Sequence, residues 1–375
     1  MLQYKTWFRA QTALFGLAAS FATAATVSVT NPTDDDWKEA PVVVRLNSAA
    51  DVKSAMADGA RSAVQADDLD GDGKPEEIVF LAALKPHETK KFTLSNEAPE
   101  TSAPPRAHAG MYIKSPTMKG MEGPGWESDL IAFRIYWDSR NATDVFCKTE
   151  PVLSLEAFAS KGMDYHNSSK WGMDVLKVGT ALGIGGFGVL DEKNVVKVAD
   201  AKRDFKLLAD GPIRAVCDFL FTDWTTSSGR KLDLTARQLI YAGQTWAECQ
   251  LTIKANDNKP PPELVAGVVQ HPGAQLIKYQ KLGVAGTWGN QALGDGQKPH
   301  SGNLGLGVTA NPEIIDGVNM DPVSLYMRLK APEGKATYRY VANWFKQPDA
   351  VKSAEEFRDY MARVQRLQPQ VKIQD

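Results

Sequence analysis

The feature that most constrains the fold is a strict alternation of apolar and polar residues in the middle of the chain. Residues 245–254 put two sets of side chains on opposite sides of an extended chain: Ala247, Cys249, Leu251 and Ile253 against Trp246, Glu248, Gln250 and Thr252. Residues 213–221 repeat the pattern with one apolar side: Ile213, Ala215, Cys217, Phe219 and Phe221. Period-two alternation marks strands of a sheet with one face on a core. The other face meets either bulk solvent or a binding cleft.

Short strand-like segments separated by turn residues recur along most of the chain, for example at 26–30, 41–46, 77–80 and 91–94. We therefore expect a mainly β protein. Residues 25–97 predict a small β domain, and residues 98–106, rich in Pro, Ser, Thr and Glu, predict a linker. Residues 107–375 predict a large antiparallel β-sandwich.

One convincing helix is expected near the end of this large domain. Residues 353–366 begin with a capping-box pattern at Ser353 and place Phe357, Met361 and Val364 on one stripe. We expect this stripe to pack against the sandwich.

Residues 1–24 have the layout of a secretory signal peptide. Lys5 and Arg9 precede an apolar stretch at 12–24, which ends in small residues at 22–24. We expect the mature protein in the periplasm or outside the cell. No other apolar run approaches the ~20 residues that a membrane helix needs, so we expect no membrane span in the mature chain. Removing Lys5 and Arg9 from 43 basic residues leaves 41 against 45 acidic ones, which gives no attraction for nucleic acid.

The three cysteines, Cys147, Cys217 and Cys249, lack the spacing of a metal site. Cys217 and Cys249 fall on apolar strand faces, so we interpret them as core residues. A disulfide is the alternative, which an exported protein permits.

One loop, at residues 68–77, has the oxygen-rich spacing of a calcium site. Its candidate ligands are Asp68, Asp70, Asp72, the Lys74 carbonyl, Glu76 and Glu77. Ca²⁺ takes roughly six to eight oxygen ligands, which this loop supplies in a β context rather than in an EF-hand. Because the loop lies in the small domain, a structural role is expected. The alternative is an acidic surface turn.

The glycine series at 179–188 does not lie in a βαβ unit, so we interpret it as a turn or a bulged strand and expect no nucleotide cofactor. Gly-x-Ser-x-Gly, the commonest serine-hydrolase signal, is absent.

Two segments carry a resemblance to a known family. They are GWESDLIAFRIYWDSRNATDVF at 125–146 and WGMDVLKVG at 171–179, the latter preceded by Tyr165-His166. The chain resembles a bacterial family catalogued as domain of unknown function 4861, and the acidic loop and the C-terminal helix resemble that family too. The family has no assigned activity. The resemblance implies a place among polysaccharide-degradation genes and a sandwich similar to the galactose-mutarotase-like superfamily.

Sugar-active proteins on such sandwiches commonly place polar and aromatic residues on one concave sheet. The polar face with Trp246, Glu248 and Gln250 fits this arrangement, and Arg237 on the preceding strand is expected to share it. The sequence leaves open whether this face is a cleft.

If the substrate is a uronate, β-elimination needs a base, an acid and groups that stabilise an enolate. His166 and Tyr165, in a polar turn, are candidates for base and acid. The alternative for His166 is a loop histidine that hydrogen-bonds to the backbone.

Three cationic residues, Arg134, Arg140 and Lys177, are candidates to bind the substrate carboxylate, since arginine suits bidentate pairing. The alternative for the two arginines is an ion pair with Asp138 or Asp144.

His271 follows a strand at 264–270 and forms a second candidate acid–base pair with Glu248, as in mutarotase-like enzymes. Four tryptophans are candidate stacking platforms for sugar rings: Trp126, Trp171, Trp246 and Trp288. Tryptophan is more often simply buried, which is the alternative for each.

The sequence therefore predicts an exported carbohydrate-active enzyme that acts on an oligo- or polysaccharide containing uronates, by β-elimination. A sugar mutarotase or epimerase, or a glycoside hydrolase, on the same fold is the alternative among enzymes. A non-catalytic glycan-binding protein and a purely structural sandwich are the alternatives from other classes.

Overall fold

The computed structural model describes residues 25–46, 49, 51–112, 121–160, 165, 168–257, 259–291 and 302–374. The chain is mainly β, as predicted, with several antiparallel sheets. The helical elements are α1 (Leu155–Ser160), α2 (Ala354–Arg366) and the 3₁₀ turns η1 (Gln280–Leu282), η2 (Pro312–Ile314) and η3 (Pro332–Gly334). In the part of the chain that the structure describes, no helix is both long and apolar enough to cross a membrane.

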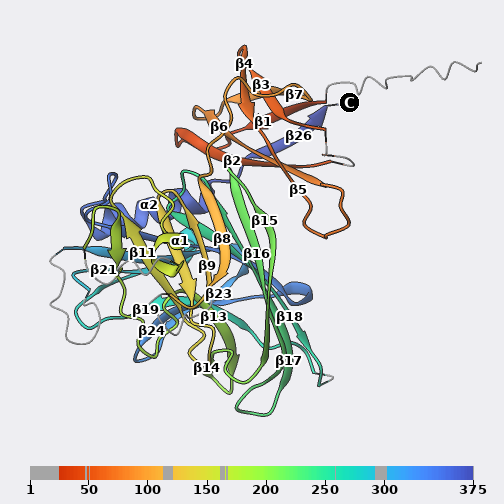
Figure 1. The fold of residues 1–375 in the computed structure, drawn as a ribbon. Coiled ribbons are helices and arrows are strands. Elements are labelled where there is room, and N and C mark those ends of the chain that lie inside the picture. Colours follow the sequence, from red (N-terminus) through yellow and green to blue (C-terminus); the bar gives the residue numbers. More distant parts are fainter. Residues whose placement is uncertain are drawn as a thin grey trace, which may run out of the picture.

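The large sandwich stacks one eight-stranded sheet against two five-stranded sheets (Figure 1). The eight-stranded sheet contains, in spatial order, β15 (Lys202–Asp210), β16 (Arg214–Thr225), β17 (Lys231–Tyr241), β18 (Trp246–Ala255), β25 (Lys335–Trp344), β22 (Leu304–Thr309), β21 (Val284–Gly289) and β20 (Gln275–Tyr279). The first opposing sheet contains β12 (Gly172–Asp174), β11 (Thr143–Lys148), β10 (Ile131–Ile135), β9 (Gly123–Ser128) and β8 (Ala107–Tyr112). The second contains β14 (Asn194–Val196), β13 (Ile184–Asp191), β19 (Leu264–Val269), β24 (Ser324–Leu329) and β23 (Ile315–Met320).

The main core lies between these layers, and the alternation in β18 decides which side chains enter it. Ala247, Cys249, Leu251 and Ile253 all point into this core, as the sequence predicted. The three cysteines are buried and free, which confirms the interpretation of Cys217 and Cys249 as core residues. One assignment was wrong: Ile213 joins the core on the other face of the sheet, because β16 begins only at the next residue.

The small domain is itself a two-layered sandwich. One sheet contains β26 (Gln370–Gln374), β1 (Thr26–Thr30), β7 (Thr89–Ser95), β3 (Ser54–Ala57) and β4 (Ala60–Ala63). The other contains β2 (Trp37–Arg45), β6 (Glu77–Leu84) and β5 (Gln65–Asp67). The C-terminal strand β26 pairs antiparallel with β1, and Figure 1 shows it in blue beside the red N-terminal strand. The chain therefore returns to its first domain, which the sequence did not reveal.

Helix α2 packs on the same sheet face as the small domain. Ser353 caps its start by accepting a hydrogen bond from the Glu356 N–H at 3.1 Å, as the capping-box pattern predicted. The stripe of Phe357, Met361 and Val364 is buried, again as predicted. Glycine on β22 makes this close packing possible, because a Cβ atom on Gly307 would lie 2.1 Å from the Met361 sulfur.

Arg214 joins the small domain to the large sheet. Its side chain is 1% exposed, and its Nε donates to Asp67 at 2.8 Å. Its Nη1 donates to Glu77 at 3.0 Å. The Gln65 side-chain oxygen accepts from the Arg214 backbone N–H at 2.9 Å. Two carboxylates thus balance one buried guanidinium across the domain boundary, which fixes how β5 and β6 sit on β16.

We predict that Arg214→Ala destabilises the protein by about 3–5 kcal/mol, because it leaves buried Asp67 without its charge partner. Arg45→Ala is the matched control, since Arg45 pairs with the same Glu77 but its side chain is 76% exposed. We expect that control to cost at most about 1 kcal/mol. Urea denaturation of both variants measures the difference, and equal costs would contradict the role given to Arg214.

Candidate functional site

A pocket of about 680 Å³ lies on the face of the eight-stranded sheet that points away from the main core. Strands β16, β17, β18 and β25 form its floor. Its walls come from β2 and β6 of the small domain and from the segment that runs from the end of α2 into β26, with Gln365, Leu367, Gln368, Pro369 and Val371. We call it the sheet pocket. The polar face that the sequence predicted therefore lines a cleft, with Arg237, Trp246 and Glu248 among the lining residues.

The strand register orders the polar groups of the pocket floor into two rows that run across the strands. Arg237 on β17 is opposite Gln250 on β18, which is opposite Thr337 on β25. In the next row, Glu248 on β18 is opposite Arg339 on β25. Neighbouring strands lie ~4.8 Å apart, so each row presents a polar group at about that interval.

Cations outnumber carboxylates in the pocket lining. The lining groups are Arg45, Arg214, Arg237, Lys335 and Arg339 against Glu77 and Glu248. Two further carboxylates, Asp67 and Asp218, pair with Arg214 and Arg237 from outside the lining. Lys335 makes no ion pair with any described residue. Four arginines thus face four carboxylates, and the remaining positive charge of the pocket is that of Lys335.

Arg339 holds the helical wall of the pocket in place. Its Nε donates to Glu248 at 3.0 Å, while its Nη1 donates to the Val364 and Leu367 carbonyls at 2.7 and 2.8 Å. These carbonyls end α2, where a cation is favourable. The guanidinium carbon also lies 4.5 Å from the Trp246 ring centroid, so one face of this indole is already covered.

Tyr241 is a buried phenol in the same pocket. Burial and the nearby Glu248 carboxylate raise its pKa to about 12, while the Arg214 and Arg339 guanidinium groups act in the opposite direction. The hydroxyl is therefore protonated at neutral pH and available as a proton donor.

All four candidate tryptophans are buried, with exposed fractions of 1% for Trp126, 7% for Trp171, 2% for Trp246 and 5% for Trp288. The Trp126 indole N–H donates to the Tyr340 hydroxyl within the main core. Trp288 packs against helix α2. The structure therefore favours the packing alternative over an open stacking platform.

Arg134 and Arg140 lie together, but away from the sheet pocket. Their guanidinium carbons lie 4.5 and 3.7 Å from the ring centroid of Tyr136. Arg134 donates to Asp144 at 2.9 Å, and Arg140 donates to Asp138 at 2.9 Å. Both arginines therefore form the intramolecular ion pairs that were the alternative to binding a substrate carboxylate.

Tyr165 and Asp174 complete what we call the Arg134 cluster, together with Arg134, Tyr136 and Asp144. The Arg134 guanidinium carbon lies 5.6 Å from the Tyr165 ring centroid. Burial, followed by the neighbouring Asp144 carboxylate, raises the pKa of Asp174 well above its usual range, although Arg134 opposes this. Arg134 thus interacts electrostatically with two carboxyl groups on adjacent strands, Asp144 on β11 and Asp174 on β12.

The second candidate pair, His271 and Glu248, is not brought together. Glu248 lines the sheet pocket, whereas His271 follows β19 in the opposing sheet, across the main core. His271 instead lies beside Lys177. Burial, followed by the Lys177 ammonium, lowers the pKa of His271, while a hydrogen bond with the Lys177 backbone acts in the opposite direction. His166, the first candidate base, lies outside the described residues.

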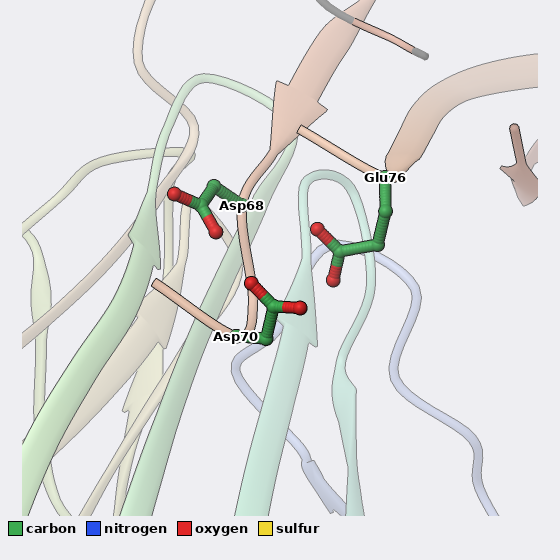
Figure 2. Close-up of side chains that lie close together, drawn as sticks. All are labelled: Asp68, Asp70 and Glu76. Carbon is green, nitrogen blue, oxygen red and sulfur yellow. The ribbon is translucent and has the colours of Figure 1, made fainter. Parts of the chain in front are cut away.

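Three acidic side chains of the candidate calcium loop converge. Ligand oxygens of Asp68, Asp70 and Glu76 all lie within 4.8 Å of one another, and Figure 2 shows the three carboxylates around a common space. Asp68 also accepts backbone N–H groups of Gly71 and Gly73, each at 2.7 Å, which hold the turn closed. Such oxygens are the ligands that Ca²⁺ prefers.

The other candidate ligands have different positions. Asp72 accepts the backbone N–H of Lys74 at 2.8 Å and does not belong to the converging group. Glu77 faces the sheet pocket, where it accepts from Arg214 and Arg45.

Sequence analysis missed several residues of the sheet pocket, among them Arg214, Tyr241, Lys335 and Arg339. The signal for the last two was present, since residues 335–340 alternate polar and apolar side chains in the same way as β18. Arg214 gave no local signal, because its acidic partners lie in another domain.

We predict opposite outcomes for the two carboxyls of the Arg134 cluster. Asp144→Asn should destabilise the protein by about 3–5 kcal/mol, because Arg134 would stay buried without its partner. Asp174→Asn should cost little. When the pKa of a carboxyl is raised in the folded state, the protein loses stability as the pH rises from the unfolded-state pKa to the folded-state pKa. With asparagine at that position, this loss of stability does not occur.

The unfolding free energy of Asp174→Asn, relative to the wild type, should therefore increase in urea titrations as the pH rises above about 4, the usual pKa of an aspartate in an unfolded chain. Asp138→Asn, in the exposed pair with Arg140, controls for charge loss alone. A flat difference for Asp174→Asn would contradict the prediction.

Comparison with known proteins supports this description. Two solved structures from Enterococcus faecalis share the fold. A protein in the glycosyl hydrolase family 38 is 9% identical, with a TM-score of 0.51, and the match covers 94% of this chain and 47% of that one. An alpha-mannosidase of strain V583 is 11% identical, with a TM-score of 0.50 over 94% and 46% of the two chains. The chain thus spans about half the length of either structure.

No curated protein matches the sequence. The family model described as domain of unknown function DUF4861 matches residues 29–373, nearly the whole chain. The resemblance carried by the segments at 125–146 and 171–179 is confirmed, and the chain belongs to the DUF4861 family.

Proposed function

We propose that this chain is an exported carbohydrate-active enzyme that takes an acidic, uronate-containing glycan in the sheet pocket. The observation that carries the proposal is the lining of this pocket. Five cationic side chains meet two carboxylates there. Amides and hydroxyls such as Gln250, Asn311 and Thr337 fill the spaces between them. Arginine recognises carboxylates, and neutral polar groups suit sugar hydroxyls.

The fold agrees with a carbohydrate ligand. The two similar solved structures are described as a glycosyl hydrolase family 38 protein and an alpha-mannosidase. Since fold alone does not determine activity, the pocket chemistry must supply the reaction.

The pocket contains groups for β-elimination. Glu248 would take the proton α to the substrate carboxylate, and the electron pair would form the new double bond as the glycosidic C–O bond breaks. Tyr241, on the adjacent strand, would donate its proton to the leaving oxygen. Arg237 would neutralise the charge that develops on the carboxylate. In this proposal Glu248 keeps a proton-transfer role, whereas Tyr165, in the Arg134 cluster, has none.

We predict that the purified mature protein releases unsaturated uronates from acidic polysaccharides, followed by their ultraviolet absorbance. Tyr241→Phe and Glu248→Gln should each lower kcat on the order of 10²-fold or more, because each removes one proton-transfer group. Lys254→Ala is the control, since Lys254 lies on β18 outside the pocket lining.

Two results would redirect the proposal. Glycan binding without any product would favour a binding protein over an enzyme. Full activity in Glu248→Gln together with loss of activity in His166→Ala would move the reaction to the turn at residues 165–166.

We also propose that the loop with Asp68, Asp70 and Glu76 binds a structural Ca²⁺. Leu69, between the first two of these residues, lines the sheet pocket, and its backbone N–H donates to Glu76 at 3.1 Å. A cation on this loop would therefore stiffen one wall of the pocket.

Adding Ca²⁺ to chelator-treated protein should raise its melting temperature, since a ligand that binds only the folded state stabilises it. Asp68→Asn or Asp70→Asn should abolish that increase. The matched control is Asp51→Asn, an exposed carboxylate elsewhere in the small domain. Identical melting curves with Ca²⁺ and with chelator would contradict a calcium site.

A further inference from the structure

Two cations on the pocket floor have a separation that is set by the strand register. Arg237 on β17 is opposite Gln250 on β18, which is opposite Thr337 on β25. Lys335 is two residues from Thr337 on the same strand, so it shares its face of the sheet. The two cations are thus two strand spacings, ~10 Å, apart across the strands and two residues, ~7 Å, apart along them.

Arg237 has unused donors that face the pocket. Its Nε and Nη2 donate to the two oxygens of Asp218 at 2.8 and 3.0 Å. Within the described ranges, its Nη1 has no hydrogen-bond partner, and the side chain is 31% exposed. The pair with Asp218 fixes the plane of the guanidinium, and Nη1 remains available for a ligand oxygen.

Lys335 is the second available cation. It is exposed at the rim of the pocket and forms no ion pair with the residues that the structure describes. Gln250 lies on β18, the strand between the two cations, and its amide nitrogen donates to Glu248 at 2.9 Å. Thr337 lies beside Lys335 on β25 and also lines the pocket. Across the strands, the order is therefore a cation on β17, an amide on β18, and a hydroxyl and a cation on β25.

A chain of pyranose rings matches this order. Each ring of an extended chain advances by about one strand spacing, and in a two-fold chain alternate rings turn their carboxylates to the same side. Two carboxylates on the first and third rings would then reach the two cations, and the hydroxyls of the middle ring would face Gln250 on β18.

Resting on the proposed function, we propose that the sheet pocket binds an oligouronide of at least three consecutive acidic sugars, laid across the strands, with carboxylates at Arg237 and Lys335. A glycan with isolated uronates among neutral sugars would engage only one of these cations. The preferred substrate is therefore a polyuronate.

Titration calorimetry with the mono-, di- and trisaccharides of mannuronate and of galacturonate tests this proposal. A Tyr241→Phe background prevents turnover of the ligand. For at least one series, the trimer should bind at least about tenfold more tightly than the monomer. Lys335→Ala should weaken trimer binding by about tenfold and leave monomer binding within about twofold. Arg237→Ala should weaken both.

The controls separate a binding effect from a folding effect. Lys254→Ala removes a cation from the same face of β18 outside the pocket lining, and it should change neither affinity. Arg237→Lys keeps a charge beside Asp218 in case Arg237→Ala does not fold, and it should still weaken binding because the planar fork is lost.

The outcomes distinguish this proposal from the one on which it rests. Monomer and trimer binding with equal affinity, or Lys335→Ala binding the trimer like the wild type, would overturn the polyuronate proposal and leave an acidic-glycan pocket. If none of these saccharides binds, both proposals fail.

Discussion

The structure depends on the eight-stranded sheet, which has an apolar core on one face and the polar sheet pocket on the other. In β17, β18 and β25, every second side chain enters the main core, and the side chains between them lie on the opposite face, where some of them line the sheet pocket. A one-residue shift in register would exchange the two faces and bury arginine and glutamate in an apolar core. The cost of that exchange fixes the register. The fixed register in turn places Arg237, Gln250 and Thr337 in one row, so core packing and site geometry have the same cause.

The pocket exists because elements distant in sequence cover part of this sheet. The small domain supplies β2 and β6, and a second wall comes from the segment between the end of α2 and the start of β26. A buried or half-buried arginine fixes each of these two walls to the sheet. Arg214 donates hydrogen bonds to Asp67 and Glu77, and Arg339 donates hydrogen bonds to Glu248 and to the last carbonyls of α2. A guanidinium suits this task because its donors can serve several acceptors at once. The pairing of β26 with β1 closes the arrangement, since it returns the C-terminus to the small domain.

Local sequence patterns predicted individual strands and helices. The contacts between elements that are distant in sequence could not be predicted from such patterns. The faces of β18 and the cap of α2 were predictable, because alternation and capping involve neighbouring residues. The return of β26 and the partners of Arg214 were not, because nothing near Gln370 or Arg214 in sequence identifies a partner hundreds of residues away. The pairing of His271 with Glu248 did not form for a related reason. Glu248 lies on a strand and His271 closely follows one, but a strand pattern does not indicate which layer of a sandwich the strand joins.

The ion pairs of the pocket floor bear on how a charged ligand would bind. A lone arginine in a partly buried pocket would lose hydration without compensation and would have many rotamers to choose from. Asp218 and Glu248 each compensate one guanidinium from the side and fix its plane. A ligand carboxylate would then meet donors that are already oriented, so less conformational entropy would be lost on binding. Lys335 is exposed and has no such partner among the described residues. In the proposed complex it would contribute charge rather than a fixed hydrogen-bond geometry, which suits a position that would accept the end of a flexible chain.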